Sequence, residues 1–302
     1  MDGILFNKDK TVLLIYPRGN SATSYYIPDS VTTISDSSFS SCDNLTSITI
    51  GTGVTSIGTF AFSGCDGLTN ITIPDNVKTI GDRAFNYCSN VTSITIGSGV
   101  TSIGGCAFNC GSKLSSINVS ADNMAYSNDS IGVLFNKDKT EINCYPAGKT
   151  ETEYIIPNTV ISIGTGAFYG CKSLTSIEIP EGVTSIRSSA FSNCSSLTSI
   201  EIPEGVTSIE SSAFSNCSSL TSIEIPKGVT SIVNSAFTGC SSLTSINVAK
   251  DNQNYSSKDG VLFNKEGTKL IKYPLNKGLM YKVPDETKEI EEGELGKIEY
   301  LE

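Results

Sequence analysis

The sequence predicts a repeat solenoid, built from short parallel β-strands with turns or short 3₁₀ pieces and interrupted by β-hairpin coils. The first sign is a short unit that recurs eight times in near-identical form. The second sign is a longer period, which relates Val31 to Val160 and Val119 to Val248. A fixed period of this kind indicates a solenoid, because one unit cannot bury its apolar face alone and must stack on the next.

Each 23-residue unit carries one phenylalanine in a fixed slot. These residues fall into two blocks of four: Phe39, Phe62, Phe85 and Phe108, then Phe168, Phe191, Phe214 and Phe237. Because the slot repeats in every stacked coil, we expect the eight rings to form a buried column, here called the Phe spine.

Each unit also contains two short extended runs. In one unit, Ile200 and Ile202 alternate with polar residues, as in a strand with one buried face, and Pro203 ends the strand. The run 206–209 predicts a second short strand, and a Ser-rich turn or a short 3₁₀ piece around the phenylalanine completes the coil. An inward residue contributes roughly 1.5–3 kcal/mol when buried, and most of that burial requires the neighbouring coil.

A different element separates the two blocks. It reads Gly-Val-Leu-Phe-Asn-Lys-Asp-Lys from residue 132, and related runs occupy 3–17 and 260–274. Two short apolar runs flank a polar turn in each copy, which predicts a β-hairpin. We therefore expect one continuous solenoid with a partial hairpin coil and entry at 1–26, four repeats at 27–118, a hairpin coil at 119–155, four repeats at 156–247, a hairpin coil at 248–283 and a degenerate acidic capping repeat at 284–302.

The capping repeat is expected because its apolar residues match a full unit. Thr287, Ile290, Leu295 and Leu301 fall where Val31, Ile34, Phe39 and Leu45 stand in the first unit. Its acidic coat suits a terminal repeat, which needs a polar outer face for solubility. A solvated charge run is the alternative interpretation. At the other end, residues 2–8 match 259–265, so we expect a fragment of a longer protein whose targeting segment has been lost.

The composition excludes several functions. A net charge of −10 argues against nucleic-acid binding, which needs a basic surface. The chain has no His, which removes Ser-His and Cys-His nucleophile pairs and imidazole metal ligands. No apolar run approaches the roughly 18–20 residues of a membrane span. We therefore expect no enzyme, no cofactor, no metal site and no membrane insertion by this fragment.

The repeat resembles the BspA-type leucine-rich repeat, and the run from Ile202 to Ile223 fits that pattern throughout. The interposed Gly-Val-Leu-Phe-Asn-Lys hairpin is also similar to that family. The resemblance implies a leucine-rich-repeat-like solenoid on surface proteins of bacteria and some parasitic protists, often adhesins for host matrix or other microbes. It implies an extracellular or cell-surface location and no catalytic site. The fourth unit departs from the pattern, because Gly111 replaces the cysteine and Cys110 stands one place early.

Seven of the ten cysteines hold one slot of the repeat. They are Cys42, Cys65, Cys88, Cys171, Cys194, Cys217 and Cys240. A metal site needs three or four ligands that converge on one point, whereas these residues should form a line, one per coil. Cysteine often packs in cores as a small apolar residue, so we predict a buried ladder of thiols. Cys106, Cys110 and Cys144 lie off the ladder, and a Cys106–Cys144 or Cys110–Cys144 disulfide is possible.

The outward residue of the predicted strand differs between the two blocks. It is Thr49, Thr72 and Thr95 in the first block, and Glu178, Glu201 and Glu224 in the second. Parallel stacking should bring the three glutamates roughly 5 Å apart, and Glu181 and Glu204 add to the same edge. One interpretation is a solvated face copied by repeat duplication. The other is an acidic stripe for a basic partner, because carboxylates in line are poor at enclosing Ca²⁺.

Two functions remain open for such a chain. The first is a surface-exposed scaffold, expected to be a monomer, whose strand face binds a protein or glycan ligand on a host or microbial surface. The second is a purely structural spacer or stalk that projects another domain of a longer protein. Adhesion by the isolated chain would separate the two.

Overall fold

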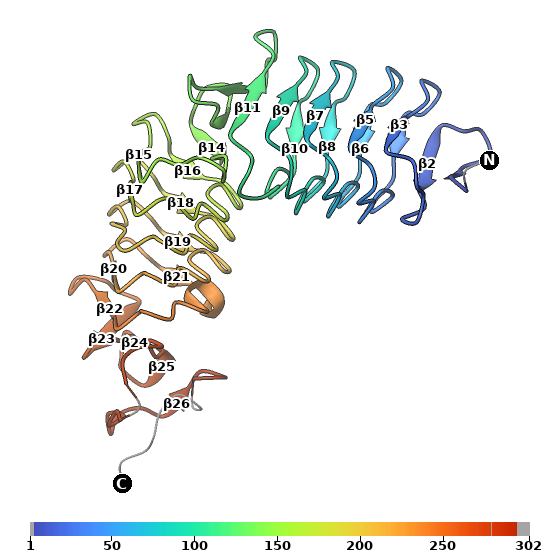
Figure 1. Ribbon diagram of the computed structural model, residues 1–302. Helices are drawn as coiled ribbons and strands as arrows, with labels where there is room; N and C mark the ends of the chain where they lie inside the picture. Colours follow the sequence, from blue (N-terminus) through green and yellow to red (C-terminus); the bar gives the residue numbers. More distant parts are fainter. Residues whose placement is uncertain (1–2, 279, 295–302) are drawn as a thin grey trace. The chain divides into compact units, whose positions relative to one another are not determined.

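The computed structural model describes residues 3–278 and 280–294 and confirms a β-solenoid (Figure 1). The chain divides into two compact units, Met1–Lys149 with Gly164–Cys171, and Thr150–Ile163 with Lys172–Glu302. Among the described residues, the only helix is the short 3₁₀ helix η1 at Asn234–Phe237. Within these same residues, no helix has the length and apolar character needed to cross a membrane.

One ladder runs through the first unit, and a second is interrupted between β5 and β7. The first follows the order β1-β2-β4-β6-β8-β10, and its first pair is an antiparallel hairpin. Its strands are β1 (Leu5–Phe6), β2 (Val12–Ile15), β4 (Thr33–Ile34), β6 (Ser56–Ile57), β8 (Thr79–Ile80) and β10 (Ser102–Ile103). The other ladder comprises β3 (Ser24–Tyr26) paired with β5 (Ser47–Thr49), and β7 (Asn70–Ile73), β9 (Ser93–Ile96) and β11 (Ser116–Val119) paired in sequence order.

The second unit repeats this arrangement. One ladder comprises β16 (Ser162–Ile163), β18 (Ser185–Ile186), β19 (Ser208–Ile209) and β21 (Ser231–Ile232). In the other, β15 (Glu153–Ile155) pairs with β17 (Ser176–Glu178), and β20 (Ser222–Ile225) pairs with β22 (Ser245–Val248). Four further strands end the unit in the order β23 (Tyr255–Lys258), β24 (Val261–Asn264), β25 (Lys269–Lys272) and β26 (Glu289–Ile290).

The core of each coil follows from the alternation of its strand. Ile71 and Ile73 of β7 are buried, whereas Thr72 between them is exposed, because successive side chains of a strand point to opposite faces. The phenylalanine rings lie inside and stack from coil to coil. The Phe62 and Phe85 ring centroids are 5.0 Å apart with an interplanar angle of 4°. Each ring therefore covers its neighbour, and a coil depends on the coils beside it.

The interposed element is an antiparallel hairpin, as its sequence predicts. β13 (Leu134–Asn136) pairs with β14 (Glu141–Cys144), and β24 pairs with β25. A third antiparallel strand, which the sequence analysis missed, lies against each hairpin: β12 (Tyr126–Asn128) in the first unit and β23 in the second. The hairpin coil is therefore a three-stranded insertion.

A buried asparagine joins each three-stranded insertion to the coil before it. The Nδ2 group of Asn123 donates hydrogen bonds to the carbonyl oxygens of Gly97 and Val100, at 2.8 and 3.1 Å. Its Oδ1 accepts from the N–H groups of Ala125 and Tyr126. Asn252 makes the same four bonds in the second unit. The side-chain amides of both asparagines are fully buried, and their NH₂ donors and carbonyl oxygens are all hydrogen-bonded, as burial of polar groups requires.

The pairing predicted for the strand that contains Glu201 is wrong. The sequence predicts that Glu178, Glu201 and Glu224 lie on neighbouring paired strands. In the described chain, however, the segment 199–202 forms no ladder with either β17 or β20. Ile200 and Ile202 are still buried and Glu201 is exposed, so the alternation of side chains is correct and only the ladder is absent.

The last described coil is held by a buried ion pair. β26 pairs in parallel with β25, and the Glu294 Oε1 atom lies 2.9 Å from the Lys272 Nζ atom, with side chains 3% and 7% exposed. The other carboxylate oxygen, Oε2, accepts a hydrogen bond of 2.9 Å from the Tyr273 N–H group. Leu295 and Leu301, which the sequence assigns to the apolar face of a capping repeat, lie outside the described residues.

All ten cysteines are buried free thiols, so neither of the possible disulfides to Cys144 is formed. Within the ladder, the Cys65 Sγ–H group donates to the carbonyl oxygen of Phe39 at 2.9 Å, and Cys217 does the same to Phe191 at 3.2 Å. Burial raises the pKa of Cys88 to about 12. Because the thiolate is the reactive form, Cys88 should be inert in the folded chain, and burial should shield the other thiols from reagents.

Thiol titration should therefore detect few reactive groups in the folded protein. After denaturation without a reductant, it should detect close to all ten thiols. The expected difference arises because folding shields the sulfur atoms and raises the pKa of thiols such as Cys88. Groups that remain unreactive after denaturation would indicate disulfides and would contradict the ladder of free thiols.

Candidate functional site

The predicted ligand-binding residues all lie on one side of the coils, here called the strand face. It is the outward side of β3, β5, β7, β9 and β11 in the first unit, and of β15, β17, 199–202, β20 and β22 in the second. The predicted residues are exposed in both units: Thr49, Thr72 and Thr95, then Glu178, Glu201, Glu224, Glu181 and Glu204. Each unit thus presents its own row of polar side chains on a buried apolar support.

Neither row is paired throughout, since β5, which carries Thr49, forms no ladder with β7. In the first unit, Thr72 stands directly opposite Thr95 in the paired strands β7 and β9. In the second unit, Glu178 stands opposite Ile155, and Glu224 stands opposite Asn247. In the paired strands that the structure describes, no glutamate of the row stands opposite another. Like charges directly opposite each other are destabilising, and this arrangement avoids them.

The unpaired segment 199–202 lies between two grooves. The larger, about 540 Å³, is lined by Ser176–Glu181 on one side and by Ser199, Ile200, Glu201 and Pro203 on the other. The smaller, about 170 Å³, lies toward β20 and is lined by Glu201, Glu204 and Glu224 among others. The sequence predicts the exposed acids of this region but not the grooves or their main-chain lining.

A proline follows the later segment at each open junction. In three closed pairs, the residue after the later strand adds one bond to the earlier strand, as the Gly97 N–H group does to the Ile73 carbonyl oxygen at 2.8 Å, and as Ser120 and Ala249 do in theirs. Proline has no N–H group and cannot make this bond. The ladder is open where the later strand ends at Pro74, Pro203 or Pro226, and closed where it ends at Gly51, Gly97, Ser120 or Ala249. The pair β15–β17, which ends at Pro180, is the exception.

The turns that follow these strands are also spaced differently. In the first unit, the Asp29 carboxylate accepts a hydrogen bond of 2.6 Å from the Thr52 N–H group of the next turn. A Cβ atom added to Gly53 would lie 1.9 Å from the Asp29 carbonyl oxygen, so these turns are in close contact. A Cβ atom added to Gly205, in the turn that follows 199–202, would lie 3.3 Å from the Val183 carbonyl oxygen and 3.4 Å from that of Glu181. The turns on the two sides of the larger groove are therefore less closely packed than those at Gly53.

The grooves carry negative charge that is largely uncompensated. Glu204 lies 3.4 Å from the Lys227 Nζ atom, and both side chains are more than half exposed. Among the described residues, Glu178, Glu181, Glu201 and Glu224 form neither an ion pair nor a side-chain hydrogen bond. Exposed carboxylates in such a row attract a cationic partner and raise the rate of encounter. The described part of the chain has no group of three or more Cys, Asp or Glu side chains arranged to hold a metal ion.

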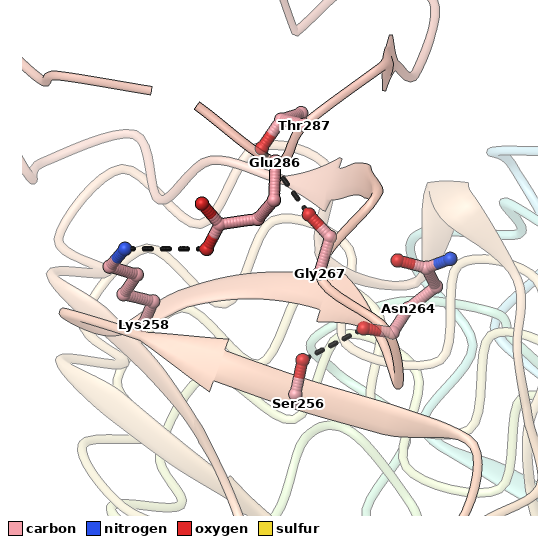
Figure 2. A network of polar contacts seen from close by, with 6 residues as sticks. All are labelled: Ser256, Lys258, Asn264, Gly267, Glu286 and Thr287. Carbon is pink, nitrogen blue, oxygen red and sulfur yellow. Dashed lines mark hydrogen bonds and ion pairs between the residues drawn. The ribbon is translucent and has the colours of Figure 1, made fainter. Parts of the chain in front are cut away.

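A second polar cluster lies at the C-terminal hairpin coil (Figure 2). The Lys258 Nζ atom lies 3.5 Å from the Glu286 Oε1 atom, and the Thr287 hydroxyl donates to the Gly267 carbonyl oxygen at 3.3 Å. The Ser256 hydroxyl donates to the Asn264 carbonyl oxygen at 2.8 Å. The first two contacts join the last described coil to the hairpin coil, and the third joins β23 to β24 within it. Since the ion pair is exposed, its contribution to stability is small.

The chain matches one known family and resembles several solved structures. The model of the BspA-type leucine-rich repeat region matches the chain in six copies, over residues 18–131 and 141–259. No curated protein matches the chain. A solved leucine-rich repeat protein from Eubacterium ventriosum is 28% identical, with a TM-score of 0.62 over 78% of this chain and 79% of that chain.

Two further solved structures resemble the chain. A leucine-rich cell surface protein from Faecalibacterium prausnitzii is 26% identical, with a TM-score of 0.57 over 99% of this chain and 96% of that chain. The pneumococcal vaccine antigen PcpA is 20% identical, with a TM-score of 0.65 over 95% of this chain and 79% of that chain. At that identity, PcpA supports the fold alone.

Proposed function

Because the chain belongs to the BspA-type leucine-rich repeat family, we propose that it is a non-enzymatic binding scaffold at a cell surface or in a secreted form. Its strand face adheres to protein or glycan ligands of a host or of other microbes. The likeness to a leucine-rich cell surface protein of Faecalibacterium prausnitzii supports the location. Leucine-rich solenoids generally serve as scaffolds, since stacked coils provide an extended surface without a catalytic pocket.

The observation that carries this proposal is the contrast between the core and the strand face. Ile177 and Ile179 are buried, while Glu178 between them is exposed, and the same order recurs at Glu201 and Glu224. Side chains repeated at fixed spacing on a packed support keep their relative positions when a ligand binds. Little entropy is then lost on association, which favours binding.

Adhesion by the isolated chain tests this function. The protein is displayed on beads, and attachment to host matrix proteins, glycans and cells is counted. Attachment well above that of uncoated beads supports the scaffold. Absence of attachment to every surface would favour the alternative, a structural spacer that projects another domain.

Replacing Glu178, Glu201 and Glu224 together with Thr should weaken binding to basic ligands and flatten its dependence on salt. The first unit carries Thr at these positions, so the change should leave the free energy of unfolding unchanged or slightly raised. Binding is measured over a salt series, because the Debye length falls from about 10 Å at 0.1 M to about 3 Å at 1 M. Unchanged affinity for every ligand would show that these acids form only a solvated face.

The matched control removes three exposed acids elsewhere. Asp122, Asp138 and Asp251 lie on turns of the hairpin coils, and replacing them with Asn changes the net charge by the same amount. This control variant should bind as the parent protein does. An equal loss in both variants would mean that net charge, rather than the strand face, governs binding.

A further inference from the structure

The segment from Ser199 to Pro203 is an unpaired strand inside a solenoid. The Thr198 N–H group donates to the Thr175 carbonyl oxygen at 3.1 Å, so the coils are still joined where the segment begins. From Ser199 to Ile202, none of the amide groups makes a hydrogen bond with the described part of the chain. Ile200 and Ile202 are 8% and 6% exposed, so packing rather than a ladder holds the segment in place.

Unpaired main-chain groups on both edges make this segment able to accept another strand. An exposed edge presents N–H and C=O groups that pair with an added chain, and several peptide-binding domains work in this way. The groove of about 540 Å³ beside the segment provides room for such a chain. Ligand pockets of roughly 300–1,000 Å³ are typical in size.

The charges around the grooves select the class of occupant. Glu178, Glu181 and Glu201 line the larger groove, and none of the described Lys or Arg residues lines it. Glu224 extends the row along the smaller groove. In an added strand, alternate side chains point to the same face, so cationic side chains at alternate positions would lie beside these carboxylates on the strand face.

We propose that the segment Ser199–Pro203 binds an extended, Lys- or Arg-bearing peptide segment of a partner protein by adding it as a β-strand. The proposal rests on the proposed binding function and names its partner class. Main-chain bonds to residues 199–202 supply affinity, and the carboxylates of Glu178, Glu201 and Glu224 supply selectivity. The first unit, which has Thr at these positions, binds such a peptide more weakly.

The probe is a short synthetic peptide that alternates Lys and Val. Three comparison peptides isolate its features: one that alternates Glu and Val, one with alternate amides N-methylated, and one with the Lys–Val residues in scrambled order. Binding is measured by calorimetry, and amide hydrogen exchange is followed at residues 199–202. In the free protein, these amides should exchange faster than those of β20.

The Lys–Val peptide should bind and slow the exchange of the amides at 199–202. N-methylation should lower affinity about tenfold or more, which is about 1.4 kcal/mol or more, because it removes the bonds to the added strand but keeps the charge. The acidic peptide should not bind. Equal affinity for the N-methylated and parent peptides would overturn strand addition.

Two variants separate the groove from the charge. Pro203→Gly supplies the N–H group that adds a ladder bond at Gly97, Ser120 and Ala249. It should therefore favour pairing of 199–202 with β17, slow exchange at 199–202 in the free protein and abolish peptide binding with every acid retained. Pro74→Gly is its matched control, because it makes the same change at the open junction between β5 and β7 of the first unit, away from both grooves, and it should bind normally. Retained binding by Pro203→Gly, with its ladder closed, would contradict the proposal.

The remaining outcomes distinguish this inference from the proposed function. Beads that adhere to host proteins, while the Lys–Val peptide leaves exchange at 199–202 unchanged, would overturn strand addition and leave the scaffold intact. Absence of adhesion and of peptide binding would overturn both. Slowed exchange with Ca²⁺ alone, and not with the peptide, would identify a cation site and overturn the peptide proposal.

Discussion

Replacing Phe191 with Ala should lower the free energy of unfolding by about 3–5 kcal/mol, from lost burial and the cavity that remains. The Phe191 side chain is fully buried, and its ring stacks on Phe214 with centroids 5.3 Å apart at 8°. Urea or thermal unfolding measures the loss. Amide exchange should show that the loss is largest in the coil of Phe191 and its neighbours, because coupling in a solenoid passes between adjacent coils.

Glu181→Ala is the matched control for Phe191→Ala. Glu181 belongs to the same coil but is exposed, so its replacement should change stability by less than about 0.5 kcal/mol. A melting temperature for Phe191→Ala equal to that of this control would contradict a buried Phe spine.

Replacing Glu294 with Ala should destabilise the last described coil by about 3–5 kcal/mol, because it leaves the buried Lys272 charge without its partner. The Tyr273 N–H group would also lose its acceptor. We expect local release of the coil that contains β26, rather than unfolding of the whole chain. Amide exchange and limited proteolysis at residues 280–294 measure this effect.

A double variant tests whether the buried charge is the cause. Glu294→Gln keeps an oxygen that can accept from the Tyr273 N–H group, and Lys272→Met removes the charge while keeping an unbranched side chain. Replacing a buried ion pair with groups of similar volume is often neutral, so the double variant should be far more stable than Glu294→Ala. Equal instability of the two would show that packing around Glu294, not the charge on Lys272, holds the coil.

The solenoid could be predicted because the 23-residue repeat is visible in the amino-acid sequence. Each phenylalanine and each inward isoleucine recurs at fixed spacing, and burial of Phe62, Phe85, Ile71 and Ile73 follows that order. Local alternation also predicts that Glu178 points outward. These features depend only on the residues within one coil and on the stacking of equivalent residues in neighbouring coils.

Pairing between coils could not be predicted from one coil. The residue after the later strand decides whether the ladder gains a last bond, and contacts between turns, such as the bond from Thr52 to Asp29, join one coil to the next. Comparison of the two blocks carries part of this signal, since Pro226 occupies the position of Gly97. The same comparison would have identified the buried asparagines, because Asn123 and Asn252 are separated by the long period of the sequence.

The acidic stripe was only half predictable for the same reason. The sequence places Glu178, Glu201 and Glu224 on one face, but it treats them as evenly stacked. In the structure, the segment 199–202 lies between two grooves, and Glu178, Glu201 and Glu224 line these grooves beside the unpaired segment.

The buried asparagine of the hairpin coil bears on how such genes change length by recombination. Asn123 and Asn252 bond to main-chain carbonyl oxygens of the preceding coil, and one acceptor belongs to Gly97 in the first case and to Pro226 in the second. The hydrogen bonds that join the insertion to the preceding coil therefore do not depend on which side chain occupies the position of Gly97 or Pro226. Unequal crossing-over can add or delete whole modules, each one long period in length, and every new junction would form the same bonds. Sequence drift within a coil and variation in the number of modules can then proceed independently.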